Sequence, residues 1–164
     1  MKTIILAGGC FWGVDHFFSK LKGVTKTTSG YIDGQSKNPT YRDVLFGSGH
    51  AEAVRVEFDE ERVTLEKILK LFFKIIDPTR EDGQGNDIGI QYRTAIYYLE
   101  DDDLAMIENV YHSIQTHYDN PLRTDIKKAG KFYPAESYHQ NYLDKNPGGY
   151  CHVNMSILKG DGEE

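Results

Sequence analysis

The alternation of strand-like and helix-like segments is the sequence feature that most constrains the fold. Runs of β-branched residues, or of residues that alternate in polarity, are interleaved with runs whose apolar residues recur every three or four positions. Strands are expected at 3–7, 25–32, 51–59 and 92–99, helices at 11–21, 65–76 and 104–114, and loops at 33–50 and 77–90. The order strand, helix, strand, strand, helix, strand predicts an α+β fold, a two-layer sandwich with a ferredoxin-like split βαβ core.

A C-terminal extension follows this core. We expect a further strand near Thr124–Lys128 and a short helix near Glu136–Leu143. No linker or shift in composition divides the chain, so residues 1–164 are expected to form a single domain. The glycine-rich segment that follows Asn146 predicts that residues 147–164 form a mobile tail.

Composition and charge exclude several classes of protein. The 164 residues are 39% hydrophobic and 27% charged, which is typical of a folded globular protein. The net charge of −6, without a basic block, argues against nucleic acid or an anionic membrane as a partner. No apolar run reaches the roughly 20 residues of a membrane helix. The aliphatic run Ile4–Leu6 is too short for a secretory signal, and there are only two cysteines, so we expect a cytoplasmic protein.

Cys10 is the first candidate for chemistry. It follows the strand that ends at Gly8-Gly9 and precedes the helix expected from Phe11. Unpaired amides and the positive end of the helix dipole at such a junction favour a thiolate. Phe11 and Trp12 place two large rings beside the sulfur, and aromatic walls of this kind can hold an uncharged methyl group. The alternative is that all three residues are ordinary core at the start of a helix.

Glu52 is the second candidate. In the strand 51–59 it shares its parity with Val54, Val56 and Phe58, so its side chain is expected to point to the apolar side or to the rim of that side. A carboxyl group beside an apolar wall is biased toward its protonated form and can act as an acid near neutral pH. The alternative is a glutamate at a strand end that reaches solvent.

Two further features are candidates for a binding or redox role. The loop Gly83–Gly89 lacks both the dinucleotide and the phosphate-loop pattern, but a long loop that enters a central strand often carries a binding site. Cys151 lies in the glycine-rich tail, from which it can reach a reactive sulfur and resolve it as a disulfide. The alternatives are a plain connection and an idle exposed thiol. The six histidines have no metal-binding spacing, so no metal site is expected.

Taken together, these segments resemble the A-type peptide methionine sulfoxide reductases. The matching strings occur in the family's order from about residue 4 to residue 151, and as a set they are highly specific. They are Gly9-Cys10-Phe11-Trp12-Gly13, Gly30-Tyr31, Pro39-Thr40-Tyr41, Gly49-His50-Ala51-Glu52-Ala53-Val54, Asp77-Pro78-Thr79, Gln84-Gly85-Asn86-Asp87, Gln91-Tyr92-Arg93, Tyr138-His139-Gln140 and Gly149-Tyr150-Cys151.

The resemblance implies a role for each matching polar residue. Cys10 resembles the family's nucleophile, and Glu52 resembles the acid that protonates the sulfoxide oxygen. Tyr41 and Tyr92 are similar to the hydroxyls that assist at that oxygen. Asp87 is similar to the carboxylate that orients the substrate.

The resemblance also implies a substrate pocket and a recycling route. Phe11 and Trp12 resemble the walls around the substrate's methyl group, and Cys151 resembles a recycling cysteine. The family reduces the S epimer of methionine sulfoxide, protein-bound or free, through a sulfenic acid and a disulfide, and is regenerated by thioredoxin or, in vitro, by DTT. Some members have two tail cysteines, whereas this tail has one, which predicts direct pairing of Cys10 with Cys151. The resemblance implies a single catalytic domain without a bound cofactor, and we expect a monomer.

Two other functions fit parts of the sequence. One is a thiol hydrolase with Cys10 as nucleophile and His16 or His50 as base, which would form an acyl-thioester rather than a dimedone-reactive sulfenic acid. The other is an aromatic-rich peptide-binding module whose cysteines are idle, which would consume no reductant.

Overall fold

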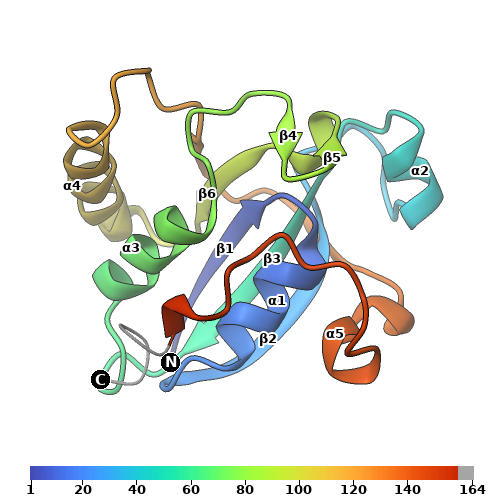
Figure 1. Cartoon of the computed structure of the whole chain (residues 1–164), viewed down its shortest axis with the longest axis horizontal. Helices are drawn as coiled ribbons and strands as arrows, with labels where there is room; N and C mark the ends of the chain where they lie inside the picture. The colour runs from blue at the N-terminus through green and yellow to red at the C-terminus, as the bar shows by residue number, and fades with distance from the viewer. Residues whose placement is uncertain (159–164) are drawn as a thin grey trace.

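One mixed, curled sheet of six strands organises residues 1–158, the part of the chain that this computed structural model describes (Figure 1). The strands are β1 (Lys2–Gly8), β2 (Val24–Ile32), β3 (Ala51–Phe58), β6 (Thr94–Tyr98), β7 (Asp125–Lys128) and β8 (Phe132–Pro134). Their order is β7-β6-β1-β3-β2-β8, with β6 and β7 parallel and all other neighbours antiparallel. A separate small hairpin pairs β4 (Gly83–Gln84) with β5 (Asp87–Ile88). The predicted α+β class is confirmed.

The main core lies between one face of the sheet and the helices in front of it (Figure 1). The helices are α1 (Phe11–Ser19), α2 (Tyr41–Leu45), α3 (Leu65–Ile75), α4 (Leu104–Gln115) and α5 (Tyr142–Lys145), with 3₁₀ turns at Ile90–Tyr92, Asp101–Asp103 and Ser137–His139. Leu6 and Val54 point into this core, whereas Ile5 and Ala53 belong to a smaller cluster on the other face. β1 is therefore buried on both sides, and its end at Gly8 lies deep in the molecule.

The expected loop 33–50 contains a helix that the sequence analysis missed. Thr40 and Asp43 form a reciprocal capping box at the start of α2: the Thr40 hydroxyl accepts from the Asp43 amide, and the Asp43 carboxylate accepts from the Thr40 amide. Five residues are too few to show helical periodicity, so the loop composition dominated the prediction. The consequence is that Tyr41 stands on the first turn of a helix.

The C-terminal extension differs most from the prediction. The strand near Thr124–Lys128 is present as β7, but the strand β8 was not expected. The helix expected over Glu136–Leu143 is wrong, because the chain forms a 3₁₀ turn and then α5. Between them the Gln140 side chain bonds the backbone of Ser29, and the backbone of Asn141 takes a left-handed conformation, with φ of 50°. These tertiary bonds interrupt the helix.

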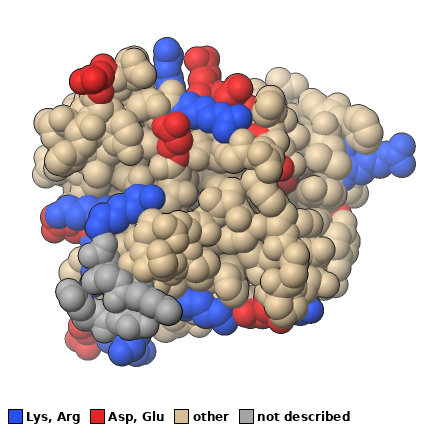
Figure 2. All heavy atoms as spheres, in the orientation of Figure 1, with Lys and Arg blue, Asp and Glu red and all other residues tan. Residues whose placement is uncertain are grey.

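The tail crosses the N-terminal end of α1 in its described part, residues 147–158 (Figure 1). Residues 159–164 of the expected mobile tail lie outside the described residues. On the face that carries the helices, charged side chains of both signs gather around the rim and leave the middle mostly uncharged (Figure 2). Within residues 1–158, no helix has the length and apolar character needed to cross a membrane.

Candidate active site

Cys10 lies at the junction of β1 and α1, as the sequence predicted. Gly9 has φ of 86°, a left-handed conformation that L side chains rarely adopt, and this turn directs the chain from the buried strand into the helix. Cys10 takes the N-cap position and is only 9% exposed. The thiol is therefore placed at the positive end of α1 but largely out of water.

Glu52 lies directly beside this helix start. Its side chain is 1% exposed and points to the same face as Val54, as the parity of β3 predicted. Oε1 accepts a hydrogen bond of 3.1 Å from the backbone amide of Phe11, the residue next to Cys10. Oε2 is buried and makes no hydrogen bond within residues 1–158. One carboxyl oxygen is thus fixed by the helix, and the other is left to carry a proton.

Burial sets the protonation states of this pair. Burial, with a smaller contribution from the neighbouring charge of Asp87, raises the pKa of Glu52 to about 8, and the hydrogen bond from Phe11 opposes this only partly. Burial also raises the pKa of Cys10, followed by the charge of Glu52, while the Trp12 amide opposes the rise. The helix-end argument, which favoured a thiolate, is therefore outweighed by desolvation. Near neutral pH both groups hold their protons.

Two tyrosine hydroxyls share this environment. Tyr41 begins α2, and Tyr92 lies in the 3₁₀ turn that precedes β6. Burial raises the pKa of Tyr41 to about 12, with added effects from Glu52 and Cys10, and a hydrogen bond with Tyr92 opposes the rise. Burial and the charge of Glu52 raise the pKa of Tyr92 as well. Both hydroxyls therefore remain protonated and can donate hydrogen bonds.

Glu136 is a supporting residue that the sequence analysis missed. Its carboxylate accepts from the Tyr41 backbone amide at 3.0 Å and from the Tyr31 hydroxyl at 2.9 Å. Glu136 thereby ties the start of α2 to β2. Nothing local marks this residue, because its partners lie about a hundred positions earlier in the chain.

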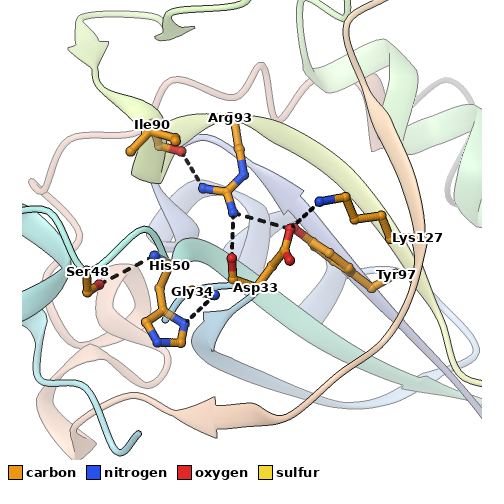
Figure 3. A network of polar contacts seen from close by, with 8 residues as sticks. All are labelled: Asp33, Gly34, Ser48, His50, Ile90, Arg93, Tyr97 and Lys127. Atoms are coloured by element: carbon orange, nitrogen blue, oxygen red, sulfur yellow. Dashed lines mark hydrogen bonds and ion pairs between the residues drawn. The ribbon is translucent and has the colours of Figure 1, made fainter. Parts of the chain in front are cut away.

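A polar network on the opposite face of the sheet holds the segment that carries Tyr92 (Figure 3). The Arg93 guanidinium donates to the carbonyl of Ile90 and to the backbone and side chain of Asp33. Tyr97 and Lys127 also donate to the Asp33 carboxylate, at 3.0 Å each. Burial alone would raise the pKa of Asp33, but these bonds outweigh it and lower the pKa. The β2–β3 loop and the turn before β6 are thus joined by a charged pair.

Aromatic side chains wall the site on the side of α1. Phe11 is 1% exposed, and the indole of Trp12 stacks on Tyr142 with ring centroids 3.7 Å apart. The Trp12 Nε1–H donates to Nδ1 of His139 at 3.0 Å. His139 also contacts the rings of Phe11 and Tyr41 at centroid distances of 5.0 and 4.5 Å. His139, which the sequence analysis gave no role, therefore holds the walls together.

Asp87 and the tail complete the cluster. Asp87 belongs to the β4–β5 hairpin, and burial raises the pKa of its carboxyl group, with His152 opposing the rise. The charge of Asp87 acts on Cys10, Glu52, Tyr41 and Tyr92, so all five groups share one region.

Cys151 approaches the same helix start from the tail. A Cβ atom placed on Gly13, in the first turn of α1, would lie 3.3 Å from its Sγ. Both cysteines are free thiols. Cys151 also lines an open pocket of about 600 Å³ with Leu143 and Met155.

The two histidines considered as bases for a hydrolase have other partners. His50 is 2% exposed, and its Nδ1 accepts from the Gly34 amide (Figure 3). Its Nε2 bonds the carbonyl of Ser36, so both ring nitrogens are occupied. His16 lies in the second half of α1 and faces Asp144. His50 therefore has no free ring nitrogen with which to activate Cys10, and the Nδ1 of His16 is 3.6 Å from the Asp144 carboxylate. Within residues 1–158, no group of three His, Cys, Asp or Glu side chains is arranged to hold a metal ion.

The fold and this cluster define a class of protein. An α+β scaffold holds a cysteine beside a carboxylic acid, two hydroxyl donors and aromatic walls, with a second cysteine close by. A cluster of this kind, with a buried thiol, a buried acid and hydroxyl donors in one place, is typical of an enzyme active site.

Comparison with known proteins identifies the family. The family model described as peptide methionine sulfoxide reductase matches residues 2–162, and the chain belongs to this family of oxidoreductases. Peptide methionine sulfoxide reductase MsrA of Clostridium acetobutylicum is 49% identical over 160 residues, which cover 97% of this chain and 99% of the relative.

Solved structures of a yeast relative are similar to this chain. Mxr1 from Saccharomyces cerevisiae in reduced form is 35% identical, with a TM-score of 0.89 over 93% of this chain and 91% of the other. A structure of Mxr1 in complex with Trx2 is 25% identical, with a TM-score of 0.62 over 86% and 84% of the two chains.

Proposed function

We propose that the Cys10 sulfur attacks the sulfur of methionine-S-sulfoxide, protein-bound or free, while Glu52 delivers a proton to the sulfoxide oxygen. The observation that carries this proposal is the placement of Glu52: Oε1 is fixed on the Phe11 amide, and Oε2 is buried without a partner beside the cysteine. With a pKa of about 8, the carboxyl group holds a proton at neutral pH. A sulfoxide oxygen leaves poorly unless it is protonated, so a buried acid is what the reaction requires.

The atoms and protons of the reductase step balance among Cys10, Glu52 and the substrate. The Cys10 sulfur forms a bond to the substrate sulfur as the oxygen takes the proton of Glu52, and the thiol proton replaces it on the carboxylate. The bond between the two sulfurs and the substrate's S–O bond then break as the hydroxyl group moves to the Cys10 sulfur, which yields a sulfenic acid and methionine, so that Cys10 is oxidised and the substrate is reduced. Because the Cys10 thiol gives its proton to Glu52 as Glu52 gives its own proton to the substrate oxygen, the buried site never holds a thiolate and a carboxylate together.

The surrounding groups fit the remaining atoms of the substrate. The hydroxyls of Tyr41 and Tyr92 donate hydrogen bonds to the oxygen as it gains charge. Phe11 and Trp12 receive the methyl group, and Asp87 orients the substrate. A site that holds the oxygen, the methyl group and the rest of the substrate in three different places distinguishes the epimers of a chiral sulfur, and the resemblance to the family implies that the S epimer is the one accepted.

Cys151 then resolves the oxidised cysteine. Its thiol attacks the Cys10 sulfenic acid, a disulfide forms, and the oxygen leaves as water. An external dithiol reduces the disulfide: thioredoxin in the cell, as the yeast relative's complex with Trx2 supports, or DTT in vitro. The open pocket beside Cys151 supports access of such a reductant.

We also interpret β6-β1-β3-β2 as a ferredoxin-like split βαβ core that β7 and β8 extend at its edges. Residues 1–164 then act as a single catalytic domain, a cytoplasmic monomer without a bound cofactor, whose tail 147–164 carries the recycling cysteine.

Reductant consumption with the two separated sulfoxide epimers tests the function. The protein is expected to consume one equivalent of reduced thioredoxin per molecule of methionine-S-sulfoxide and none with the R epimer. C10S is expected to consume no thioredoxin with either epimer. Equal consumption with both epimers would contradict the proposed stereochemistry, and turnover by C10S would contradict the role of Cys10.

A further inference from the structure

The two residues that flank Cys151 are both tied to fixed backbone. The Tyr150 hydroxyl accepts a hydrogen bond of 3.1 Å from the amide of Asn86, in the loop that carries Asp87. The Nε2 of His152 bonds the carbonyl of Gly8 at 2.7 Å. A carbonyl only accepts, so Nε2 carries the hydrogen and His152 is the donor.

The hydrogen bond of His152 joins two chain segments that each carry a cysteine. Gly8 ends the buried strand β1 and lies two residues before Cys10, while His152 lies one residue after Cys151. A hydrogen bond between these two positions therefore brings the segments that carry the two cysteines together. A Cβ atom on Gly13 would lie 3.2 Å from Nδ1 of His152 and 3.3 Å from Sγ of Cys151, so both side chains reach the first turn of α1.

The local packing of His152 supports a fixed position. Its neighbour Val153 is 7% exposed and packs in the main core, and the Val153 carbonyl accepts from the Cys151 thiol at 3.5 Å. Burial lowers the pKa of His152, although the bond to Gly8 and the charge of Asp87 oppose this, so the imidazole is neutral near pH 7. The contact with Gly8 is thus a neutral, buried hydrogen bond.

We propose that Tyr150 and His152 form a tail anchor that holds Cys151 within reach of Cys10, with His152 as the main positioning residue of the recycling step. This proposal rests on the proposed role of Cys151. Disulfide formation joins Sγ of Cys151 to the Cys10 sulfenic sulfur and releases water, and the anchor acts only by keeping the first sulfur near the second. Release of the first methionine precedes this step and does not require the anchor.

The test compares H152L, which removes the donor, with H152Q, whose amide nitrogen can occupy the place of Nε2. After rapid mixing with one equivalent of methionine-S-sulfoxide, methionine release and the Cys10–Cys151 disulfide are followed separately by quenching and mass spectrometry. H152L is expected to release methionine at the wild-type rate but to form the disulfide about 10²-fold more slowly, the cost of displacing a reacting group by about 1 Å. H152Q is expected to restore most of the rate, and Y150F is expected to slow disulfide formation while leaving methionine release intact.

The outcomes separate this inference from the proposed function. C151S is measured in parallel: if it turns over repeatedly with thioredoxin, Cys151 is not the recycling residue, and both its proposed role and the tail anchor are overturned. If C151S stalls while H152L forms the disulfide at the wild-type rate, only the tail anchor is overturned. Equal slowing in H152L and H152Q would also overturn it, because the donor would then not be the feature that matters. Should H152L fail to fold, a wild-type rate of disulfide formation in Y150F would overturn the anchor.

Discussion

At the scale of single residues, the proposed reaction depends on where one proton lies. Glu52 is held by the Phe11 amide through Oε1, so its negative charge would be buried beside Cys10 if the carboxyl group ionised. The protein thus keeps an acid in its neutral form at the pH of the cell, which a solvent-exposed glutamate does not do. The same desolvation keeps Cys10 a thiol, so ionisation of the sulfur and proton transfer from Glu52 are linked.

The first prediction concerns stability and Glu52. Its pKa is about 8 in the folded protein against an ordinary 4.5, so the folded state binds more protons between these values and stability falls as the pH rises through this range. In E52Q the amide oxygen can still accept from Phe11, but position 52 no longer titrates. The free energy of unfolding of E52Q is therefore expected to exceed that of wild type by on the order of a few kcal/mol at pH 8. Urea unfolding of both proteins at pH 5 and pH 8 measures the difference. Parallel pH profiles for the two proteins would contradict the prediction.

At the scale of elements, the first turn of α1 is where the helix, β3 and the tail meet. Gly13 faces the tail there, and a side chain at that position would have Val153 Cγ2 within 3.0 Å and Cys151 Sγ within 3.3 Å. Glycine in a helix is usually unfavourable by about 1 kcal/mol relative to alanine, so its presence here is explained by the close approach of the tail.

The second prediction follows from that contact. G13A is expected to raise the intrinsic helix propensity of α1 but to displace the tail. Disulfide formation is then expected to slow by up to about 10²-fold, while the first methionine is released at the wild-type rate. G130A serves as the matched control, because a Cβ atom there meets nothing within 4 Å. Rapid quenching measures both steps. A wild-type rate of disulfide formation in G13A would show that the tail does not need this space.

The elements also show which patterns were predictable. The parity of β3 correctly placed Glu52 on the apolar face, and the run before Gly8-Gly9 correctly placed Cys10 at a strand–helix junction, because both signals are local. The helix α2 was too short to show a period, although its Thr40 and Asp43 caps were visible in the sequence. The broken helix before α5 was not predictable, since Gln140 makes its bonds with a strand more than a hundred residues away.

At the scale of the whole molecule, the site is assembled from segments far apart in the chain. Cys10 and Glu52 come from the core, whereas the supporting residues Glu136 and His139 come from the last thirty residues. Neither these two residues nor the tail contact of His152 with Gly8 was predictable, because their partners are set by how the C-terminal extension wraps around the sheet. A matching sequence string can contain such a residue, as Tyr138-His139-Gln140 does, without indicating which side chains the residue contacts.

The third prediction tests whether the two ends of the chain work as one cycle. C151S is expected to release about one methionine per enzyme with thioredoxin and then to stall as the sulfenic acid, which dimedone traps on Cys10. Excess DTT, a small dithiol that can attack the sulfenic acid directly, is expected to restore turnover. Sustained turnover of C151S with thioredoxin would mean that recycling bypasses the tail.

The central claim is that a protonated Glu52 drives the reductase step. The most direct measurement is the single-turnover rate of methionine formation from methionine-S-sulfoxide, from pH 6 to pH 9, in wild type and E52Q. The wild-type rate is expected to fall as the pH rises through about 8, and E52Q is expected to be slower by roughly 10²–10⁴-fold without that fall. A wild-type rate in E52Q, or the same alkaline fall in both proteins, would contradict the account.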